Sequence, residues 1–118
     1  MTPLEEAERQ SRLWHILDAG TRLVEITRGH TVADYETDIP FQWAVERGLT
    51  IVGEAAVQLR RADPRIAERI TNMQGIIGFR NKIIHEYPDI DSNEVWRIIR
   101  DDLPLLLAEV RALLPPTP

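Results

Sequence analysis

The stretch GFRNKIIHEY, residues 78–87, decides the fold because it has the pattern of a helix but carries an arginine among its apolar positions. On a helical wheel of roughly 100° per residue, Arg80 falls inside an apolar arc. The arc is formed by Met73, Ile76, Ile77, Phe79, Ile83, Ile84 and Tyr87. A guanidinium in such a stripe is costly unless it is paired or reaches water. The stretch therefore predicts either a buried ion pair, with Glu54 as a candidate partner, or a cleft that Arg80 faces.

Asn81 and His85 are four residues apart and share the strip beside this arc with Gly78. Arg80 and His85 differ by roughly 140° on the wheel, so they do not lie on one face. Both can still reach one cleft, because Arg80 is long and His85 is near the end of the helix. His85 is suited to acid–base chemistry near neutral pH, although a histidine on a helix surface is also commonly only solvated.

Outward from this stretch, apolar spacing and capping residues predict further helices and no strand. Thr2 and Pro3 indicate a first helix that stops at Arg28-Gly29, and residues 30–40 are predicted to be a loop. Pro104 predicts a break near Asp102 in the last helix. The remaining helices are predicted at about 41–61, 65–70, 72–86 and from 91 onward. We expect one all-α domain over 1–118, an up-and-down bundle of four to five helices, with a frayed tail at 115–118.

The helix predicted at 41–61 is apolar on more than one side. One face carries Phe41, Val45, Leu49, Val52, Ala56 and Leu59, and the other side carries Trp43, Ile51 and Val57. A helix of this kind is either central in a bundle or shared with a partner subunit.

The composition narrows the class of protein. The chain has 118 residues, 43% of them hydrophobic, and no cysteine, which excludes disulfides and thiolate metal sites. No apolar run is long enough to cross a membrane, and the N-terminus is acidic, so we expect a cytoplasmic protein. The net charge of −5 argues against broad duplex binding but permits RNA at one small basic site. His15, His30 and His85 lack metal-ligand spacing, so neither a metal nor a cofactor is predicted.

Three segments resemble one known family: RNKIIHEY at 80–87, TIVGEAA at 50–56 and VWRIIRDDLPLL at 95–106. The first resembles the R-x4-H-x-Y signature of the HepT-like toxins in the HEPN superfamily, and the resemblance spans roughly residues 10–114. It implies a homodimeric helical bundle with a composite cleft at the dimer interface. It also implies a metal-independent endoribonuclease, the toxin of a type VII-like pair. Its partner would be a nucleotidyltransferase antitoxin that transfers AMP to Tyr87.

By this resemblance Arg80 would bind a phosphate, and His85 would act as general base or acid. Asn81 would orient the imidazole or contact a phosphate oxygen, and Glu54 would pair with Arg80 or shape the cleft. The alternative is a binding module without catalysis that docks a nucleotidyltransferase or a nucleotide. The chain departs from the family pattern at Arg47-Gly48, where Arg-Asn is expected, and at residues 72–77, where a tryptophan commonly precedes Gly78.

Other residues carry weaker signals. Arg61, Arg65 and Arg69 recur every four residues and would either guide RNA or form a solvated face. Trp14, Trp43 and Trp96 are interpreted as core or interface anchors.

Overall fold

The computed structural model describes residues 1–86 and 89–116, and within these residues the chain is helical without a β-strand. The all-α prediction is therefore confirmed. The four longer helices are α1 (Pro3–Thr27), α3 (Ile39–Ala62), α5 (Met73–Glu86) and α7 (Leu103–Leu113). Short elements connect them: α2 (Val32–Thr37), α4 (Pro64–Ala67), α6 (Ser92–Arg97) and the π-helical turn η1 (Ile98–Asp102).

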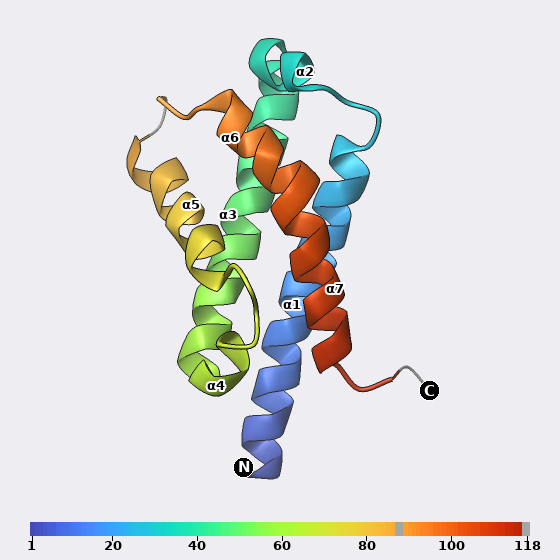
Figure 1. The fold of residues 1–118 in the computed structure, drawn as a ribbon, viewed down its shortest axis with the longest axis vertical. Coiled ribbons are helices and arrows are strands. Elements are labelled where there is room, and N and C mark those ends of the chain that lie inside the picture. The colour runs from blue at the N-terminus through green and yellow to red at the C-terminus, as the bar shows by residue number, and fades with distance from the viewer. Residues whose placement is uncertain (87–88, 117–118) are drawn as a thin grey trace.

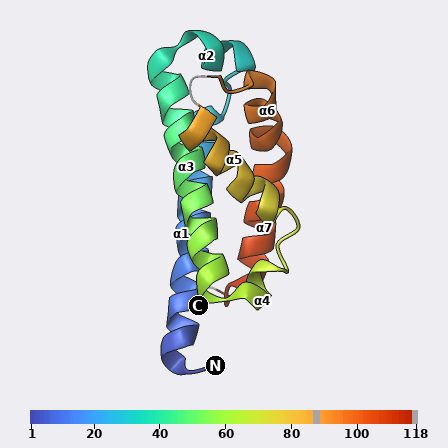
Figure 2. The same cartoon turned by 90° about the vertical axis from the view of Figure 1, so that its left-hand side faces the viewer.

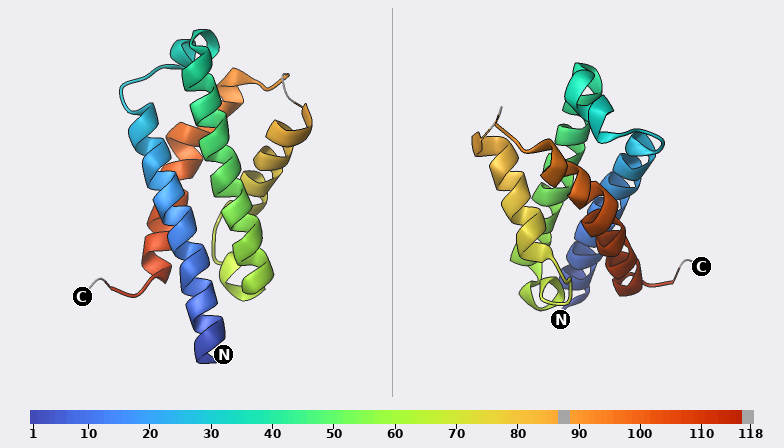
Figure 3. Two further views of the ribbon diagram at one scale, coloured as in Figure 1. Left: turned by 180° about the vertical axis from the view of Figure 1, so that it is seen from behind. Right: turned by 45° about the horizontal axis from the view of Figure 1, so that its top comes forward.

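The long helices alternate in direction, as the up-and-down prediction requires (Figure 1). Helices α1 and α3 run beside each other along the long axis, α5 packs against α3, and α7 packs against α1 (Figures 1 and 2). Seen from behind, α1 and α3 form one side of the molecule, with α7 on the far side (Figure 3, left). Helix α3 is therefore the central element that links α5 to the rest of the bundle.

Helix α3 buries the apolar face that its spacing predicts. All six residues of that face, from Phe41 to Leu59, are at most 8% exposed. On its other side, Trp43 is 60% and Ile51 40% exposed, whereas Val57 is half-buried against the core. The two-sided pattern of the sequence thus separates into a core face and an unpartnered outer face.

The prediction of a loop over residues 30–40 is wrong, because α2 occupies most of it. The hydroxyl of Thr31 accepts the N–H of Asp34, and the Asp34 carboxylate accepts the N–H of Thr31, which caps the helix reciprocally. Tyr35 is then buried, with its hydroxyl donating to Oε2 of Glu46 at 2.7 Å. The predicted stop of the first helix is confirmed, since Gly29 takes a positive φ of 78° just after α1.

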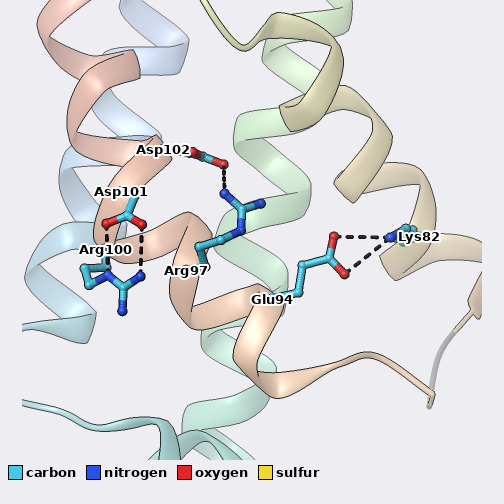
Figure 4. Close-up of polar contacts among 6 residues, drawn as sticks. All are labelled: Lys82, Glu94, Arg97, Arg100, Asp101 and Asp102. Atoms are coloured by element: carbon cyan, nitrogen blue, oxygen red, sulfur yellow. Dashed lines mark hydrogen bonds and ion pairs between the residues drawn. The ribbon is translucent and has the colours of Figure 1, made fainter.

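The predicted break near Asp102 is confirmed as the π-helical turn η1. Pro104 has no N–H to donate within the helix, and the N–H of Leu103 instead bonds to the carbonyl of Ile98, five residues earlier. Ion pairs line this turn, with Arg97 and Asp102 joined at 3.1 Å (Figure 4).

The same region is tied to α5 by a surface contact. Nζ of Lys82 lies 3.2 Å from Oε1 of Glu94 on α6 (Figure 4). Within the turn, the hydrogen bonds from Arg100 lower the pKa of the Asp101 carboxyl.

The short helix predicted at 65–70 is shorter than expected and covers Pro64–Ala67. At its start the Asp63 carboxylate accepts the N–H of Ile66.

Candidate active site on helices α3 and α5

Helix α5 crosses α3 at Gly53, and Arg80 lies at the crossing point. A Cβ atom added to Gly53 would lie 2.3 Å from Cβ and 2.7 Å from Cγ of Arg80. The missing side chain at position 53 is therefore what lets the Arg80 stem lie directly on α3. Phe79 and Ile83, 4% and 8% exposed, hold the same helix in the core on either side of Arg80. This places the predicted arginine within the apolar arc of α5, as the wheel indicated.

The guanidinium of Arg80 is held by two polar groups. Nη2 forms an ion pair with Oε2 of Glu54, and Nη1 donates to Oδ1 of Asn81 at 2.7 Å. The side chains of Arg80 and Glu54 are 23% and 48% exposed, so the pair lies at the surface and is not sealed in the core. The Nε atom of Arg80 is buried and has no hydrogen-bond partner in the described part of the chain. The protein alone therefore does not satisfy this guanidinium.

Each terminal nitrogen of an arginine carries two N–H groups. In Arg80 one N–H on each terminal nitrogen is engaged, by Glu54 and by Asn81, which leaves one on each for a ligand. Two neighbouring N–H donors match the two oxygens that a phosphodiester presents. The guanidinium thus keeps donors for an anion beyond those that Glu54 and Asn81 occupy.

His85 follows Asn81 by one turn and is exposed on the last turn of α5. Its side chain makes no hydrogen bond or ion pair with any residue that the structure describes. The structure thus brings Arg80, Glu54 and Asn81 together and leaves His85 one turn further along the same helix. Tyr87, the predicted modification site, lies outside the described residues.

Exposed apolar side chains flank the Arg80–Glu54 pair on both helices. Trp43 precedes Glu54 by three turns on the same face of α3, and Ile84 follows Arg80 by one turn on α5. Ile84, a member of the predicted apolar arc, is 47% exposed and does not share the burial of Ile83. The C-terminal end of α5 leans away from α3, so the last turn has less of the bundle to pack against (Figures 1 and 3).

Sequence reasoning assigned no role to Gly53 or to a groove beside the pair. The groove lies between α1 and α3, has a volume of about 380 Å³, and includes Glu54 and Arg47 among its lining residues. Arg47, Ile51 and Glu54 are spaced by four and three residues, which places them on one side of α3. That spacing is the sequence signal that identifies the α3 wall of the groove.

The weaker candidates lie elsewhere. Trp96 packs on the ring of Phe41, with 6.3 Å between centroids, whereas Trp14 is 49% exposed. The side chains of Arg61, Arg65 and Arg69 are exposed.

Across residues 1–86 and 89–116, no group of three or more His, Cys, Asp or Glu side chains lies close enough together to hold a metal ion. No helix in this part of the chain is both long and apolar enough to span a membrane.

Comparison with known proteins identifies the family of this chain. The family model described as Ribonuclease HepT-like matches residues 16–113. A protein of Methanocaldococcus jannaschii, named provisionally as an RNase, is 30% identical over 100 residues, which cover 83% of this chain and 89% of the relative. A protein of Thermococcus cleftensis, named as a probable ribonuclease HepT, is 30% identical over 98 residues, 83% of this chain and 88% of its own. No solved structure gives a significant match. The chain belongs to the HepT-like ribonuclease family of the HEPN superfamily.

Proposed function

We propose that this protein is a metal-independent endoribonuclease that cleaves RNA in a cleft at the interface of a homodimer. It acts in the cytoplasm as the toxin of a type VII-like toxin–antitoxin pair. The observation that carries the proposal is the Arg80–Glu54 pair, a surface guanidinium fixed at a helix crossing with donors left free. The family match and the ribonuclease names of the relatives support the same activity.

In this proposal Arg80 binds the non-bridging oxygens of the scissile phosphodiester. The negative charge on these oxygens grows in the transition state, and charge-assisted hydrogen bonds from Arg80 stabilise it. His85 takes the proton from the ribose 2′-hydroxyl, whose oxygen attacks phosphorus while the bond to the 5′-oxygen breaks. The leaving 5′-oxygen takes up a proton from an acid, for which His85 of the second copy is the candidate. The products are a 2′,3′-cyclic phosphate and a 5′-hydroxyl.

Asn81 and Glu54 are positioning residues in this mechanism. The amide oxygen of Asn81 accepts a hydrogen bond from Arg80, and its NH₂ group stays available for a phosphate oxygen or for His85 one turn away. Glu54 holds the guanidinium from the α3 side. Together they fix the orientation of a side chain that otherwise has many rotamers.

The dimer would place two copies of the Arg80–His85 helix opposite each other across a two-fold axis. The exposed apolar residues Trp43 and Ile84, on either side of the Arg80–Glu54 pair, support an interface on this face. Light scattering on the purified protein should give twice the mass of the chain. Charged replacements at the two positions, Trp43→Glu and Ile84→Glu, should shift the measured mass toward that of the monomer and reduce cleavage. A wild-type protein that is monomeric and fully active would refute the composite cleft.

The regulatory half of the proposal concerns Tyr87. A nucleotidyltransferase antitoxin would transfer AMP from ATP to the tyrosine hydroxyl with release of pyrophosphate. An anionic AMP two residues after His85 would repel RNA from the cleft. Intact-mass measurement after incubation with ATP and the partner should show one added AMP per chain, absent in Tyr87→Phe. A mass gain that persists in this variant would place the modification elsewhere.

The decisive experiment is RNA cleavage in EDTA. We expect a 2′,3′-cyclic phosphate product in mass spectra, and a fall in kcat of about 10²–10⁴-fold for His85→Ala, as for loss of a general base. Arg80→Ala should be similarly impaired. Arg111→Ala, an equal loss of charge at an exposed position on α7, should cleave like the wild type. Intact RNA at every concentration of the unmodified dimer would refute the catalytic proposal.

One observation favours the alternative of a binding module without catalysis. In the structure the charge of Arg80 is already paired with Glu54, and His85 forms no hydrogen bond or ion pair with either residue. On this alternative, the helix only docks a nucleotidyltransferase or a nucleotide. Copurification with a nucleotidyltransferase, harmless overexpression and no RNA cleavage would together select it.

A further inference from the structure

The groove between α1 and α3 adjoins the Arg80–Glu54 pair. The two helices that form it lie beside each other on the side seen from behind (Figure 3, left). Arg12 and His15 line it from α1, and Arg47, Thr50 and Glu54 line it from α3. Glu54 therefore contacts both the groove and the guanidinium of Arg80. A ligand that lies in this groove ends beside the candidate active site.

Arg47 is the available cation in this groove. Its side chain is exposed and has no hydrogen bond or ion pair with any residue in the described ranges. Arg12 is different, because its Nη2 lies 2.8 Å from Oε1 of Glu8 and its charge is already compensated. Arg47 precedes Glu54 by two turns of α3, which is about 10.5 Å along the helix axis. An arginine without a partner in the described part of the chain therefore lies two helical turns along α3 from the pair that would hold the scissile phosphate.

The lining of the groove is mixed. Ile51 and Ala55 contribute apolar side chains, and Gln58 and His15 contribute an amide and an imidazole ring. A volume of about 380 Å³ falls within the range of roughly 300–1,000 Å³ that small-ligand pockets occupy. Apolar side chains beside an amide and a free arginine match one nucleotide, whose base packs on the apolar side chains while its phosphate meets the arginine.

We propose that this groove binds the single-stranded RNA next to the cleaved phosphodiester, with Arg47 as the residue that positions a flanking phosphate. This inference rests on the proposed function, because it gives the groove the strand whose next phosphodiester Arg80 holds. Single-stranded RNA fits better than a duplex, since one unpaired arginine in the groove of a chain with net charge −5 neutralises little of a duplex backbone. Recognition through an exposed base and one phosphate needs no broad basic surface.

The test measures RNA binding without cleavage. A fluorescein-labelled, mixed-sequence RNA oligonucleotide is titrated with the full-length His85→Ala protein, and anisotropy is followed over a range of salt concentrations. Adding Arg47→Ala should weaken binding about tenfold and reduce the salt slope by about 0.7, the loss of one phosphate contact to a single strand. Arg47→Lys should recover part of the affinity. Adding Arg111→Ala, on the far side of the bundle, should leave both the affinity and the slope near the starting values.

In the otherwise wild-type protein, Arg47→Ala should raise KM more than it lowers kcat, because it removes a binding contact outside the chemistry. Unchanged affinity and salt slope in the Arg47→Ala protein, with matching circular dichroism, would overturn the groove proposal and leave the proposed function intact. If the His85→Ala protein cleaves RNA as fast as the wild type, the proposed function itself fails.

Titration with AMP distinguishes the two ligands that the groove could bind, an RNA strand and a free nucleotide. We expect AMP to compete only weakly with the labelled RNA. Tight AMP binding that Arg47→Ala abolishes, with RNA affinity unchanged, would make the groove a mononucleotide site and overturn the assignment to RNA.

Discussion

Replacing Gly53 with alanine tests how the fold positions Arg80. The added Cβ would lie 2.3 Å from Cβ of Arg80, and that atom is fixed to the backbone of α5, so no change of rotamer removes the clash. Carbon atoms in contact normally lie about 3.5–4.0 Å apart. Helix α5 must therefore move away from α3 by at least about 1 Å.

Two opposing effects set the stability of this variant. Overpacking a close contact typically costs about 1–3 kcal/mol, whereas alanine in place of glycine inside a helix stabilises it by about 0.8–1.0 kcal/mol. We expect Gly53→Ala to lower the free energy of unfolding by roughly 0–2 kcal/mol and to remain folded. Activity should suffer more, because a displacement of about 1 Å at a reacting group costs on the order of 100-fold in rate.

Urea unfolding followed by circular dichroism measures the change in stability. The change in activity is measured as kcat/KM on a quenched fluorescent RNA. Gly78→Ala is the matched control for stability, since nothing lies within 4 Å of a Cβ at that position on α5. If Gly53→Ala gains as much stability as Gly78→Ala, the contact at Gly53 does not constrain α5. If it is destabilised but cleaves RNA normally, the crossing does not position Arg80.

Three other substitutions give separate tests. Glu54→Gln keeps the side-chain shape but removes the charge that competes with RNA phosphate, so anisotropy should show tighter RNA binding while kcat falls. Tyr35→Phe removes the donor 2.7 Å from the buried Glu46 carboxylate, and urea unfolding should show a loss of about 1.5–3 kcal/mol. Asp34→Ala should lower Tm at neutral pH. The backbone N–H of Thr31 holds the pKa of Asp34 below its ordinary value of 3.8, so the wild-type advantage is present above that pH and lost as the pH falls through the lower folded-state value.

The long helices could be predicted because their signals are local. Apolar spacing and capping residues depend only on neighbours in sequence, and the helix at 39–62 and the break before Pro104 followed from them. Helix α2 was missed because it is short and has a single buried apolar anchor, Tyr35. Its Thr31–Asp34 capping box was the available signal.

Features of the site that depend on two helices could not be predicted from one helix alone. The wheel of α5 placed Ile84 in the apolar arc, but whether that position is buried depends on α3 still being alongside at that turn. The glycine in TIVGEAA indicates nothing by itself about which helix crosses it, and the contact with Arg80 emerges only from the packing. The pairing of Arg80 with Glu54, 26 residues apart, could be proposed from their opposite charges. The sequence could not show whether the pair is buried in the core or faces a cleft at the surface.

The weakness of the Arg80–Glu54 pair would allow a phosphate to compete for the guanidinium. A fully buried ion pair would hold the guanidinium against any ligand, because breaking it leaves an uncompensated charge in the core. Here Glu54 is 48% exposed, and an ion pair with such access to water contributes about 0–1 kcal/mol. A phosphodiester that makes two charge-assisted hydrogen bonds can compete with a contact of that size. The position of Arg80 then depends on the packing of its stem against Gly53, which does not change when RNA displaces the carboxylate.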